Sequence, residues 1–499
     1  MQSQFVPLVF QTCRQQAALH ERNLAHQLNR IKLRADVPDG FDGVYLFGSL
    51  SDFLAGSPSQ FRQNSSVDFP VTSFGGFVQD HWSLGRQLTV DLGVRYDFER
   101  LPAGFNQDTN NVSPRIGLAW SPSPKWVFRA GYGVFFDRYV LANLTRAIER
   151  NGSQAFEQVV DGNAATSLFA ATQGGPLVAP AYGVAPSVFS PDRRMATPYS
   201  QQASAGAEYL LATSLTLRAD YLFVHGVKVP RTLNVNLLPP VVLTLRNASG
   251  LGVPNPTPQQ IGREVFLPGR LNTQFSDICQ LQDSAGSTYN GASLTLTRRM
   301  NRELEFSASY TLSKTFDNAS DFDEQPQNPF RLAAENALSR QHQQQRFVFN
   351  ALWDLPIGEE EDKDGKSKEG ASWLTETFSH IELAPILTLE SGRPVNPLTG
   401  LDSNQSHAFP LSARPLGLHR NSLNAPALAT MDFRVLKYFP FGGVKRLDLV
   451  AEFFNLFNSP NVSQINPVFG SGLTPIPGFR QSIGGTGARQ IQFSLDFEF

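Results

Sequence analysis

The chain ends with residues 490–499, QIQFSLDFEF, in which polar and apolar side chains alternate without a break from Gln490 to Phe499. Successive side chains of a β-strand point to opposite faces, so this stretch predicts a strand with one apolar and one polar face. Its apolar face carries three phenylalanines in ten residues. Such a strand needs an apolar environment along its whole length on one side, which either a packed core or a lipid bilayer provides.

The same alternation recurs along most of the chain. Many of the alternating segments have 10–13 residues, whereas strands in soluble proteins average about 5–6 residues and tilted membrane-spanning strands need about 9–11. Their length therefore favours strands that cross a membrane. Thirteen segments are clear, at 74–84, 87–98, 113–121, 125–136, 201–210, 214–224, 288–298, 303–314, 345–355, 379–391, 428–439, 445–457 and 489–499, and three weaker ones precede them near 28–37, 41–47 and 58–66.

The connections between these segments alternate between short and long. Short ones are 85–86, 122–124, 211–213, 299–302 and 440–444, and long ones are 99–112, 137–200, 225–287, 315–344, 392–427 and 458–488. Connection 356–378 is longer than the other short ones and carries a charged run at 359–364. Outer-membrane barrels have short periplasmic turns and long extracellular loops. The sequence therefore predicts an all-β, antiparallel transmembrane barrel of about sixteen strands.

Aromatic residues gather at the predicted periplasmic strand ends. Trp82, Trp120, Trp126, Trp353 and the terminal Phe499 all fall there, which is typical of an interfacial belt. The alternative is that these aromatics form the core of large soluble sheets. That alternative requires a covering layer over every apolar row, and the sequence shows no helical layer.

Composition excludes several other classes of protein. The 499 residues include 17% charged side chains and carry a net charge of −2, which argues against nucleic acid as a partner. No run of apolar residues is long enough for a transmembrane helix. Cys13 and Cys279 form neither a disulfide framework nor a metal motif. Residues 1–23 lack the basic start of a signal peptide.

Several phrases resemble the barrel of TonB-dependent transporters, in particular the Oar-like subgroup. The phrases occur in the family's order and extend over residues 22–499. They are FVQDHW at 77–82 with LTVDLGVRYD at 88–97, SPRIGLAW at 113–120, RAGYGVFFD at 129–137, TPYSQQ at 197–202, YNGA at 289–292, YTLSK at 310–314 and EFFNLFN at 452–458.

This resemblance implies the C-terminal portion of a transporter barrel in the bacterial outer membrane. Such a barrel has 22 strands, of which about sixteen are found here. We expect two segments: an unassigned start at 1–21 and a partial barrel at 22–499. The family's plug and TonB box are not recognised in this sequence, so we expect a fragment or a truncated gene product. Implied partners are outer-membrane lipid, the barrel assembly machinery, an unknown ligand, and the TonB complex through a plug.

Motifs of catalysis and cofactor binding are not found. The sequence contains no GxSxG, HExxH or GxxxxGK[ST], and its eight histidines are scattered, so we expect neither an enzyme nor a cofactor. One acidic group in the 315–344 loop, Asp317, Asp321, Asp323 and Glu324, could bind Ca²⁺ through oxygen ligands. A solvated outer loop is the favoured interpretation of that group. His342 is expected at a polar barrel rim.

Charged residues on the strands are predicted to face the lumen, because a charge at mid-depth in lipid costs about 2–4 kcal/mol. In strand 379–391 the same argument predicts that Leu383 and Leu387 face lipid while Thr388 faces inward. The predicted lumen residues are Arg95, Arg115, Arg129, Arg218, Asp91, Asp97 and Asp220.

Three functions remain open at this point. The favoured one is the barrel portion of a TonB-dependent transporter that takes up a large or scarce ligand. The second is a barrel enzyme, for which no catalytic constellation is found. The third is an outer-membrane barrel for adhesion or protein secretion, with loops 137–200 and 225–287 as contact surfaces.

Overall fold

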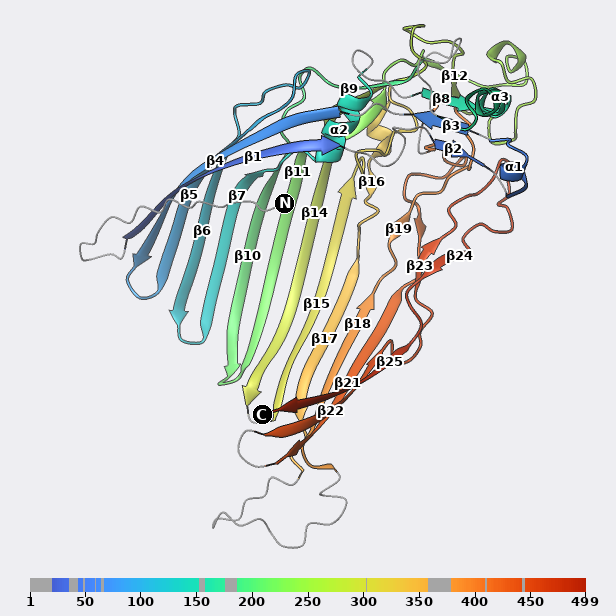
Figure 1. Cartoon of the computed structure of the whole chain (residues 1–499). Helices are drawn as coiled ribbons and strands as arrows, with labels where there is room; N and C mark the ends of the chain where they lie inside the picture. The colour runs from blue at the N-terminus through green and yellow to red at the C-terminus, as the bar shows by residue number, and fades with distance from the viewer. Residues whose placement is uncertain are drawn as a thin grey trace, which may run out of the picture.

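The computed structural model describes residues 20–35, 44–47, 50–58, 60–63, 67–151, 158–175, 186–301, 303–357, 378–408, 411–441 and 445–499. Its main feature is one curved, antiparallel sheet, in which fourteen strands lie side by side in the order β1-β4-β5-β6-β7-β10-β11-β14-β15-β17-β18-β21-β22-β25 (Figure 1). These strands are β1 (His20–Ala35), β4 (Val67–Leu84), β5 (Leu88–Arg100), β6 (Val112–Ser123), β7 (Trp126–Phe136), β10 (Tyr199–Ala212), β11 (Leu215–Asn234), β14 (Ile278–Asn301), β15 (Leu304–Asp317), β17 (Gln345–Asp354), β18 (Ile381–Glu390), β21 (Leu428–Pro440), β22 (Arg446–Phe454) and β25 (Gln490–Glu498).

The short elements gather at the end of the sheet where the long connections lie (Figure 1). Two short strands extend the main sheet to sixteen, since β9 (Val188–Pro191) pairs with β14 and β16 (Ala337–Leu338) pairs with β15. The others are β2 (Val44–Leu46), β3 (Gln60–Gln63), β8 (Gln158–Asp161), β12 (Pro240–Val242), β13 (Glu264–Phe266), β19 (Pro394–Val395), β20 (Leu423–Asn424), β23 (Val462–Ile465), β24 (Ser482–Gly485), helices α1 (Leu50–Leu54), α2 (Leu141–Glu149) and α3 (Gly162–Thr172), and 3₁₀ turns η1 (Ser249–Leu251) and η2 (Leu332–Glu335).

The predicted fold class is confirmed, because each of the thirteen clear segments coincides with one long strand of the main sheet. The three weaker segments have different outcomes. Segment 28–37 overlaps β1, which pairs with β4 along its length. Segments 41–47 and 58–66 overlap β2 and β3, which form a separate three-stranded sheet with β8 and do not cross the membrane beside the others. The charged run 359–364 lies outside the described residues.

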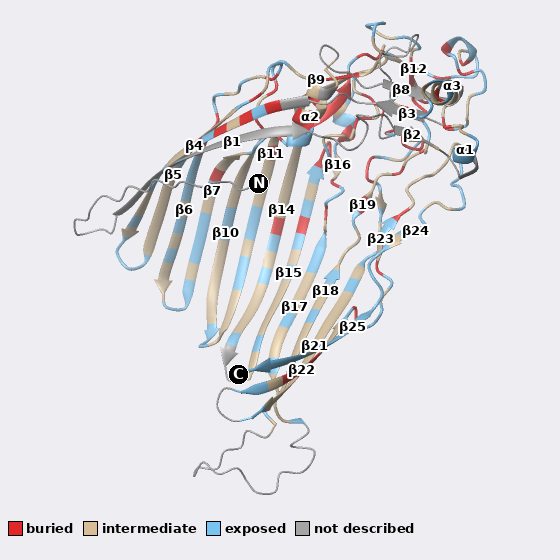
Figure 2. Ribbon diagram, viewed as in Figure 1, coloured by how far each residue is buried: buried red, intermediate tan, exposed pale blue. Residues whose placement is uncertain are grey.

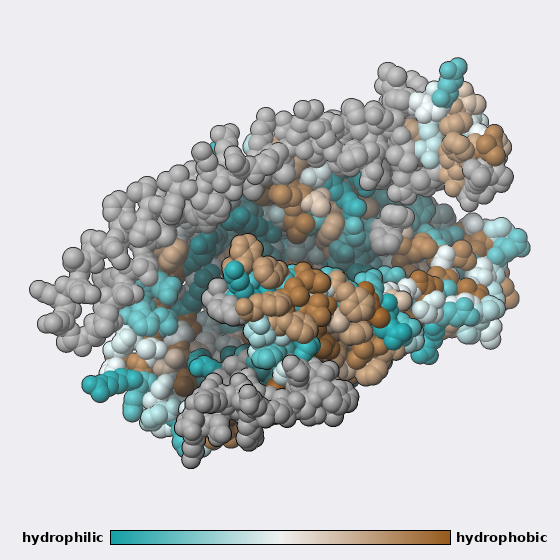
Figure 3. All heavy atoms as spheres, turned by 60° about the horizontal axis from the view of Figure 1, so that its bottom comes forward, coloured by the Kyte–Doolittle hydropathy of each residue, from teal (hydrophilic) through white to brown (hydrophobic). Residues whose placement is uncertain are grey.

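Cross-strand register places the apolar rows on one face of the sheet. Leu88 is paired with Trp120, and Trp120 with Phe128 on the next strand, so the outward row continues from strand to strand. Polar residues occupy the alternate positions and face the concave side. Figure 3 shows this hollow, with hydrophilic residues deep inside it and hydrophobic residues on the near outer surface. The strands thus separate an apolar exterior from a polar lumen.

The packed core lies in the loop end of the molecule and not between the strands. Figure 2 shows most buried residues near α2, the upper part of β4 and the long loops. One cluster joins the top of the wall to α2: it contains Phe69, Val71, Leu101, Phe105, Tyr139, Leu144, Ala147, Phe189, Met195 and Leu281. The loops therefore pack into an ordered cap, which we define as the described residues of connections 101–111, 137–198, 235–277, 318–344, 391–427 and 455–489.

The edges of the sheet are β1 and β25. Within the described ranges no pairing joins these two strands, so the hydrogen-bonded order runs from β1 to β25 without closing on itself. Among the described residues, no helix has the length and apolar character needed to cross a membrane.

Candidate functional site

The inner wall of the lumen carries ion pairs between neighbouring positions of the polar face. Arg95 binds Asp97 on the same strand at 2.6 Å, and Arg218 binds Asp220 at 2.7 Å. Arg129 reaches Glu208 on the adjacent strand at 2.9 Å. These pairs need no loop to hold them, because residues i and i+2 of a strand share a face and adjacent strands are about 4.8 Å apart.

The register places the seven residues predicted to line the lumen on the polar face of the sheet, and their role in a lumen remains a prediction. Asp91 accepts a hydrogen bond from His81 on the neighbouring strand at 2.7 Å, with the His81 proton on Nδ1. Among the four predicted lumen arginines, the guanidinium of Arg115 stacks on an aromatic ring, that of Phe135, at 4.6 Å from the ring centre. The wall is thus polar but largely self-neutralised.

Two glycines let side chains lie flat against this wall. A Cβ at Gly133 would lie 2.7 Å from the Phe135 ring, and a Cβ at Gly75 would lie 2.4 Å from Arg95 Nη2. Both distances are shorter than a tolerable contact, so the missing side chains create the space that Phe135 and Arg95 occupy. A substituted side chain at either position would push its neighbour into the lumen.

The predicted aromatic belt also has a consistent position. Trp82, Trp120, Trp126 and Trp353 lie on the outward face close to the short turns, and each is about two-fifths exposed. Trp126 packs on Tyr209 with ring centres 4.5 Å apart, and Phe499 follows the last residue of β25. An interfacial role for these residues remains a prediction.

The cap contains buried charges that are held across distant loops. Arg420 is almost fully buried and binds Asp317 at 2.7 Å and Glu324 at 2.8 Å. It also donates to the backbone carbonyl of Glu335, whose carboxylate forms a two-pronged pair with Arg414 at 2.7 and 2.8 Å. Together Asp317, Glu324, Glu335, Arg414 and Arg420 form what we call the cap knot, which ties loop 318–344 to loop 391–427.

The cap knot contains two members of the acidic group that was considered as a calcium site, Asp317 and Glu324. Asp317 and Glu324 face Arg420, and Asp323 binds Arg146 of α2, so three of the four carboxylates are neutralised by arginine. Among the described residues, no group of three acidic, histidine or cysteine side chains is arranged to hold a metal ion. Of the predicted set Asp317, Asp321, Asp323 and Glu324, three members thus pair with arginines of other segments, Asp317 and Glu324 with Arg420 and Asp323 with Arg146.

Burial and ion pairing act in opposite directions on the pKa of Glu324, and burial also lowers the pKa of a nearby arginine outside the knot, Arg263. Burial alone would raise the pKa of Glu324, but the hydrogen bonds and charge of Arg420 outweigh it and hold that pKa below its usual range. Arg263, which donates to Asn404 Oδ1 at 2.8 Å, has no carboxylate partner in the described chain. Its burial and the nearby Arg414 lower the pKa of Arg263 to about 10.

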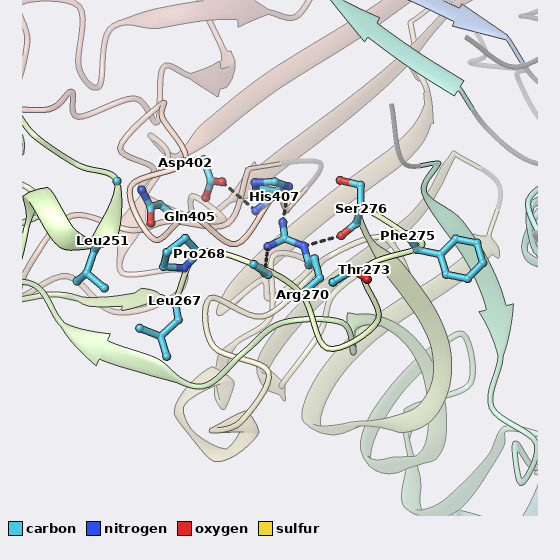
Figure 4. A pocket seen from close by; sticks show the side chains of 12 residues that line it. Leu251, Leu267, Pro268, Arg270, Thr273, Phe275, Ser276, Asp402, Gln405 and His407 are labelled. Carbon is cyan, nitrogen blue, oxygen red and sulfur yellow. Dashed lines mark hydrogen bonds between the residues drawn. The ribbon is translucent and has the colours of Figure 1, made fainter. Parts of the chain in front are cut away.

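A cavity of about 660 Å³ opens between two loops of the cap. Figure 4 shows its two sides: Leu251, Leu267 and Pro268 form an apolar side, while Arg270 projects toward His407. Arg270 Nη2 donates to His407 Nδ1 at 2.6 Å, and Arg270 Nε donates to the carbonyl of Ser276 at 2.5 Å. The cavity thus combines an apolar wall with fixed polar groups, which is the usual composition of a ligand pocket.

Arg270 and His407 also surround Asp277. Its carboxylate lies 3.4 Å from Arg270 and 3.6 Å from His407, and Asn234 donates to it at 2.7 Å. Burial would raise the pKa of Asp277, but these partners hold it below its usual range. The acidic group therefore stays ionised and holds one side of the cavity in position.

Sequence reasoning found the wall but missed the cap residues. The arginines of the cap lie in connections with no alternating pattern: Arg263, Arg270, Arg414 and Arg420. Arg414 and Arg420 bind carboxylates that are 79 and 103 residues away, and Arg146 binds a carboxylate that is 177 residues away. His342, expected at a polar rim, is buried beneath the loops, and its Nδ1 accepts the backbone N–H of Thr315 at 3.2 Å.

Residues 35–104 and 100–419 match the family profile described as "Outer membrane beta barrel domain". Because the match covers most of the chain, the chain belongs to this family, and its location is the bacterial outer membrane. A stretch of 73 residues is 44% identical to the TonB-dependent transporter Oar of Myxococcus xanthus, which is 14% of this chain and 7% of that protein.

Solved structures agree with the fold. The outer membrane transporter YddB of Escherichia coli superposes with a TM-score of 0.54 at 12% identity, over 98% of this chain and 53% of that one. A variant of the ferric enterobactin receptor PfeA of Pseudomonas aeruginosa superposes with a TM-score of 0.52 at 13% identity, over 96% and 51%. The chain therefore spans about half the length of the receptors it resembles, and at this identity the likeness concerns the fold.

Proposed function

We propose that this chain forms the wall and outer cap of a TonB-dependent outer-membrane transporter for a large or scarce ligand. The observation that carries the proposal is the combination of a polar inner face with a cap of packed loops that holds a cavity of about 660 Å³. A porin needs an open mouth, whereas ordered loops over a lumen suit capture of a specific ligand. The relationship to Oar supports the energised class of transporter.

In this proposal the barrel has a passive, non-enzymatic role. Its outer face contacts lipid, its strands are inserted by the barrel assembly machinery, and its inner wall contacts a plug that connects to the TonB complex. Residues 22–499 act as the barrel part and residues 1–21 remain unassigned. In this proposal the charged wall residues line the lumen. The aromatic belt lies at the membrane interface and consists of Trp82, Trp120, Trp126, Trp353 and Phe499.

Growth of a deletion strain tests this function directly. We expect a strain without the full-length gene to grow poorly on one class of scarce nutrient among ferric chelates, oligosaccharides and peptides. The complete gene should restore growth, and a protonophore or loss of TonB should abolish that rescue. Normal growth on every class, or rescue that persists without TonB, would contradict energised uptake.

One observation favours the alternative function, in which the cap binds another protein. Several large apolar side chains of the cap are exposed, including Leu245, Leu271, Phe330 and Leu473, and exposed apolar groups of this kind mark interaction surfaces. In that case the deletion strain would keep normal nutrient uptake and lose cell-to-cell adhesion or secretion of a protein. The same strain therefore separates the two functions.

A further inference from the structure

Arg115 differs in one respect from six other arginines on the inner wall. Six inward arginines each lie within 4.0 Å of a carboxylate: Arg95, Arg129, Arg218, Arg346, Arg434 and Arg446. Arg115 has no carboxylate within that distance in the described part of the chain. A guanidinium in a wall that otherwise neutralises its charges is available to a group from outside the wall.

The position of Arg115 gives such a group a place to bind. Arg115 and Phe135 line two recesses of the inner wall, of about 290 and 270 Å³. The ring of Phe135 lies flat over Gly133, and the guanidinium stacks on this ring at 4.6 Å. Stacking orients the plane of the guanidinium and leaves its edge, which carries the N–H donors, free to form hydrogen bonds.

The carboxylates that line the same recesses are already engaged. Asp91 accepts from His81 at 2.7 Å, and Asp97 accepts from Arg95 at 2.6 Å. Glu99 accepts the backbone N–H of Tyr139 at 3.1 Å, and Asp137 accepts the backbone N–H of Arg138 at 2.8 Å. None of these four acids occupies the edge of Arg115.

Neutral donors complete the recess. The carboxamides of Gln79 and Gln202 and the hydroxyl of Ser204 line the first recess together with Arg115. A planar guanidinium with five N–H donors matches the two oxygens of a carboxylate or phosphate, and amide N–H groups can bind further oxygens. Four glycines also line this recess, and their lack of side chains leaves it open: Gly93, Gly117, Gly131 and Gly133.

We propose that Arg115 is the anchor of a solute-binding site on the inner wall, which binds a carboxylate or phosphate group of a ligand in the lumen. The site deepens the proposed function and rests on it, since an anchor at this depth serves a ligand that has passed the cap. Phe135 positions the guanidinium, and Gln79 and Gln202 contribute hydrogen bonds to the same anionic group.

Arginine labelling on the full chain in isolated outer membranes tests whether Arg115 is available. We expect phenylglyoxal to modify Arg115 faster than the paired Arg95, Arg129 and Arg218, as read from peptides by mass spectrometry. Inorganic phosphate should slow the modification of Arg115 without changing the other three rates. Equal rates for the four arginines, or a rate at Arg115 that phosphate does not change, would overturn the site.

Phosphate binding to the purified full chain in detergent provides the second readout, followed by phosphorus NMR. We expect Arg115→Gln to weaken binding roughly tenfold, as loss of a charge-assisted hydrogen bond predicts, and Arg115→Lys to restore part of it. Arg129→Gln is the matched control, because it removes an inward arginine of the next strand that already has Glu208. Heat-modifiable gel mobility confirms that each variant is folded.

The outcomes distinguish this site from the transport function. Equal binding by wild type and Arg115→Gln would overturn the anchor even if energised uptake is intact. Selective labelling and phosphate protection of Arg115 in a protein that fails the growth test would retain the anion site and reject the transporter.

Discussion

The strand wall and the cap both use arginine–carboxylate pairs, but the two regions use them differently. In the wall, Arg129 and Glu208 are 49% and 30% exposed, and the pairs Arg95–Asp97 and Arg218–Asp220 join residues i and i+2 of one strand. In the cap, Arg420 and Asp317 are 1% and 5% exposed and 103 residues apart. The wall pairs are wet and local, whereas the cap pairs are dry and join distant loops.

This difference assigns different physical roles to the same chemistry. A solvated ion pair contributes about 0–1 kcal/mol, because water screens the charges and the side chains lose freedom when they pair. Removal of one partner from a buried pair costs about 3–5 kcal/mol, because the remaining charge is left without compensation in a dry site. We therefore expect the cap pairs to hold the loops together and the wall pairs to make the lumen polar at little energetic gain.

The largest expected effect follows from breaking the cap knot. Arg420→Met leaves Asp317 and Glu324 buried without their cation, and we expect the cap to lose about 3–5 kcal/mol of stability. Limited proteolysis of intact cells measures this change, because loosened outer loops are cut while the spanning strands are protected. Arg331→Met is the matched control, since Arg331 is exposed and lies 3.3 Å from Glu264 at the surface. Equal protease resistance of the wild type and Arg420→Met would contradict the proposed stabilising effect of the cap knot.

A charge on the lipid face has the next largest effect and tests the wall itself. Leu387 is in register with Phe349 and Met431 on the apolar face, whereas its neighbour Thr388 occupies the inward face. Leu387→Arg should cost about 2–4 kcal/mol near mid-depth and impair assembly, while Thr388→Arg should be tolerated. Heat-modifiable gel mobility reports the folded fraction of each variant. Similar folding of the two variants would contradict the facing assignment of β18.

The same contrast explains what the sequence could predict. The thirteen long strands that follow β1 in the main sheet were predictable, because the period of two in segments such as 87–98 is imposed by the pleat and by lipid on one side. Arg95, Arg115 and Arg129 could be assigned to the polar face by the same parity. The cap knot could not be predicted, because the contact of Arg420 with Asp317 depends on how two long loops fold over each other.

The limits of the pattern are also visible at the weak segments. Segments 41–47 and 58–66 contain short alternations that are satisfied locally, where Phe61 packs with Tyr45 and β3 pairs with β8. The strands in these segments, β2 and β3, contain only three and four residues, so their apolar side chains can be covered by neighbouring residues and do not require lipid. A long alternating segment therefore predicted a membrane-crossing strand, whereas a short alternating segment did not.

Acidification should weaken the cap before it affects the wall. Burial, together with the charge of Lys314, lowers the pKa of His342, so its neutral form stabilises the fold and this contribution fades as the pH falls below about 6.5, where the unfolded histidine protonates. The lowered pKa of Glu324 gives a second contribution, which is lost as the pH falls below about 4.3.

We therefore expect the protease resistance of the cap to fall in two steps, one below neutral pH and one in acid, while the strands stay protected. His342→Gln should remove the first step and leave the second. A single step at low pH in the wild type, or an unchanged first step in the variant, would exclude His342 as its source.

The smallest expected effect is in the wall. Arg129→Gln removes the cation that binds Glu208 at 2.9 Å, but both groups are solvated, so the loss of stability should stay within about 0.2–1 kcal/mol. Urea unfolding of the barrel in detergent at low and at high salt measures this loss, and salt should reduce it further by screening the wild-type pair. A loss of several kcal/mol that salt does not change would mean that the wall pair is shielded from water, and the distinction between wall and cap pairs would then fail, although the side chains of Arg129 and Glu208 are 49% and 30% exposed.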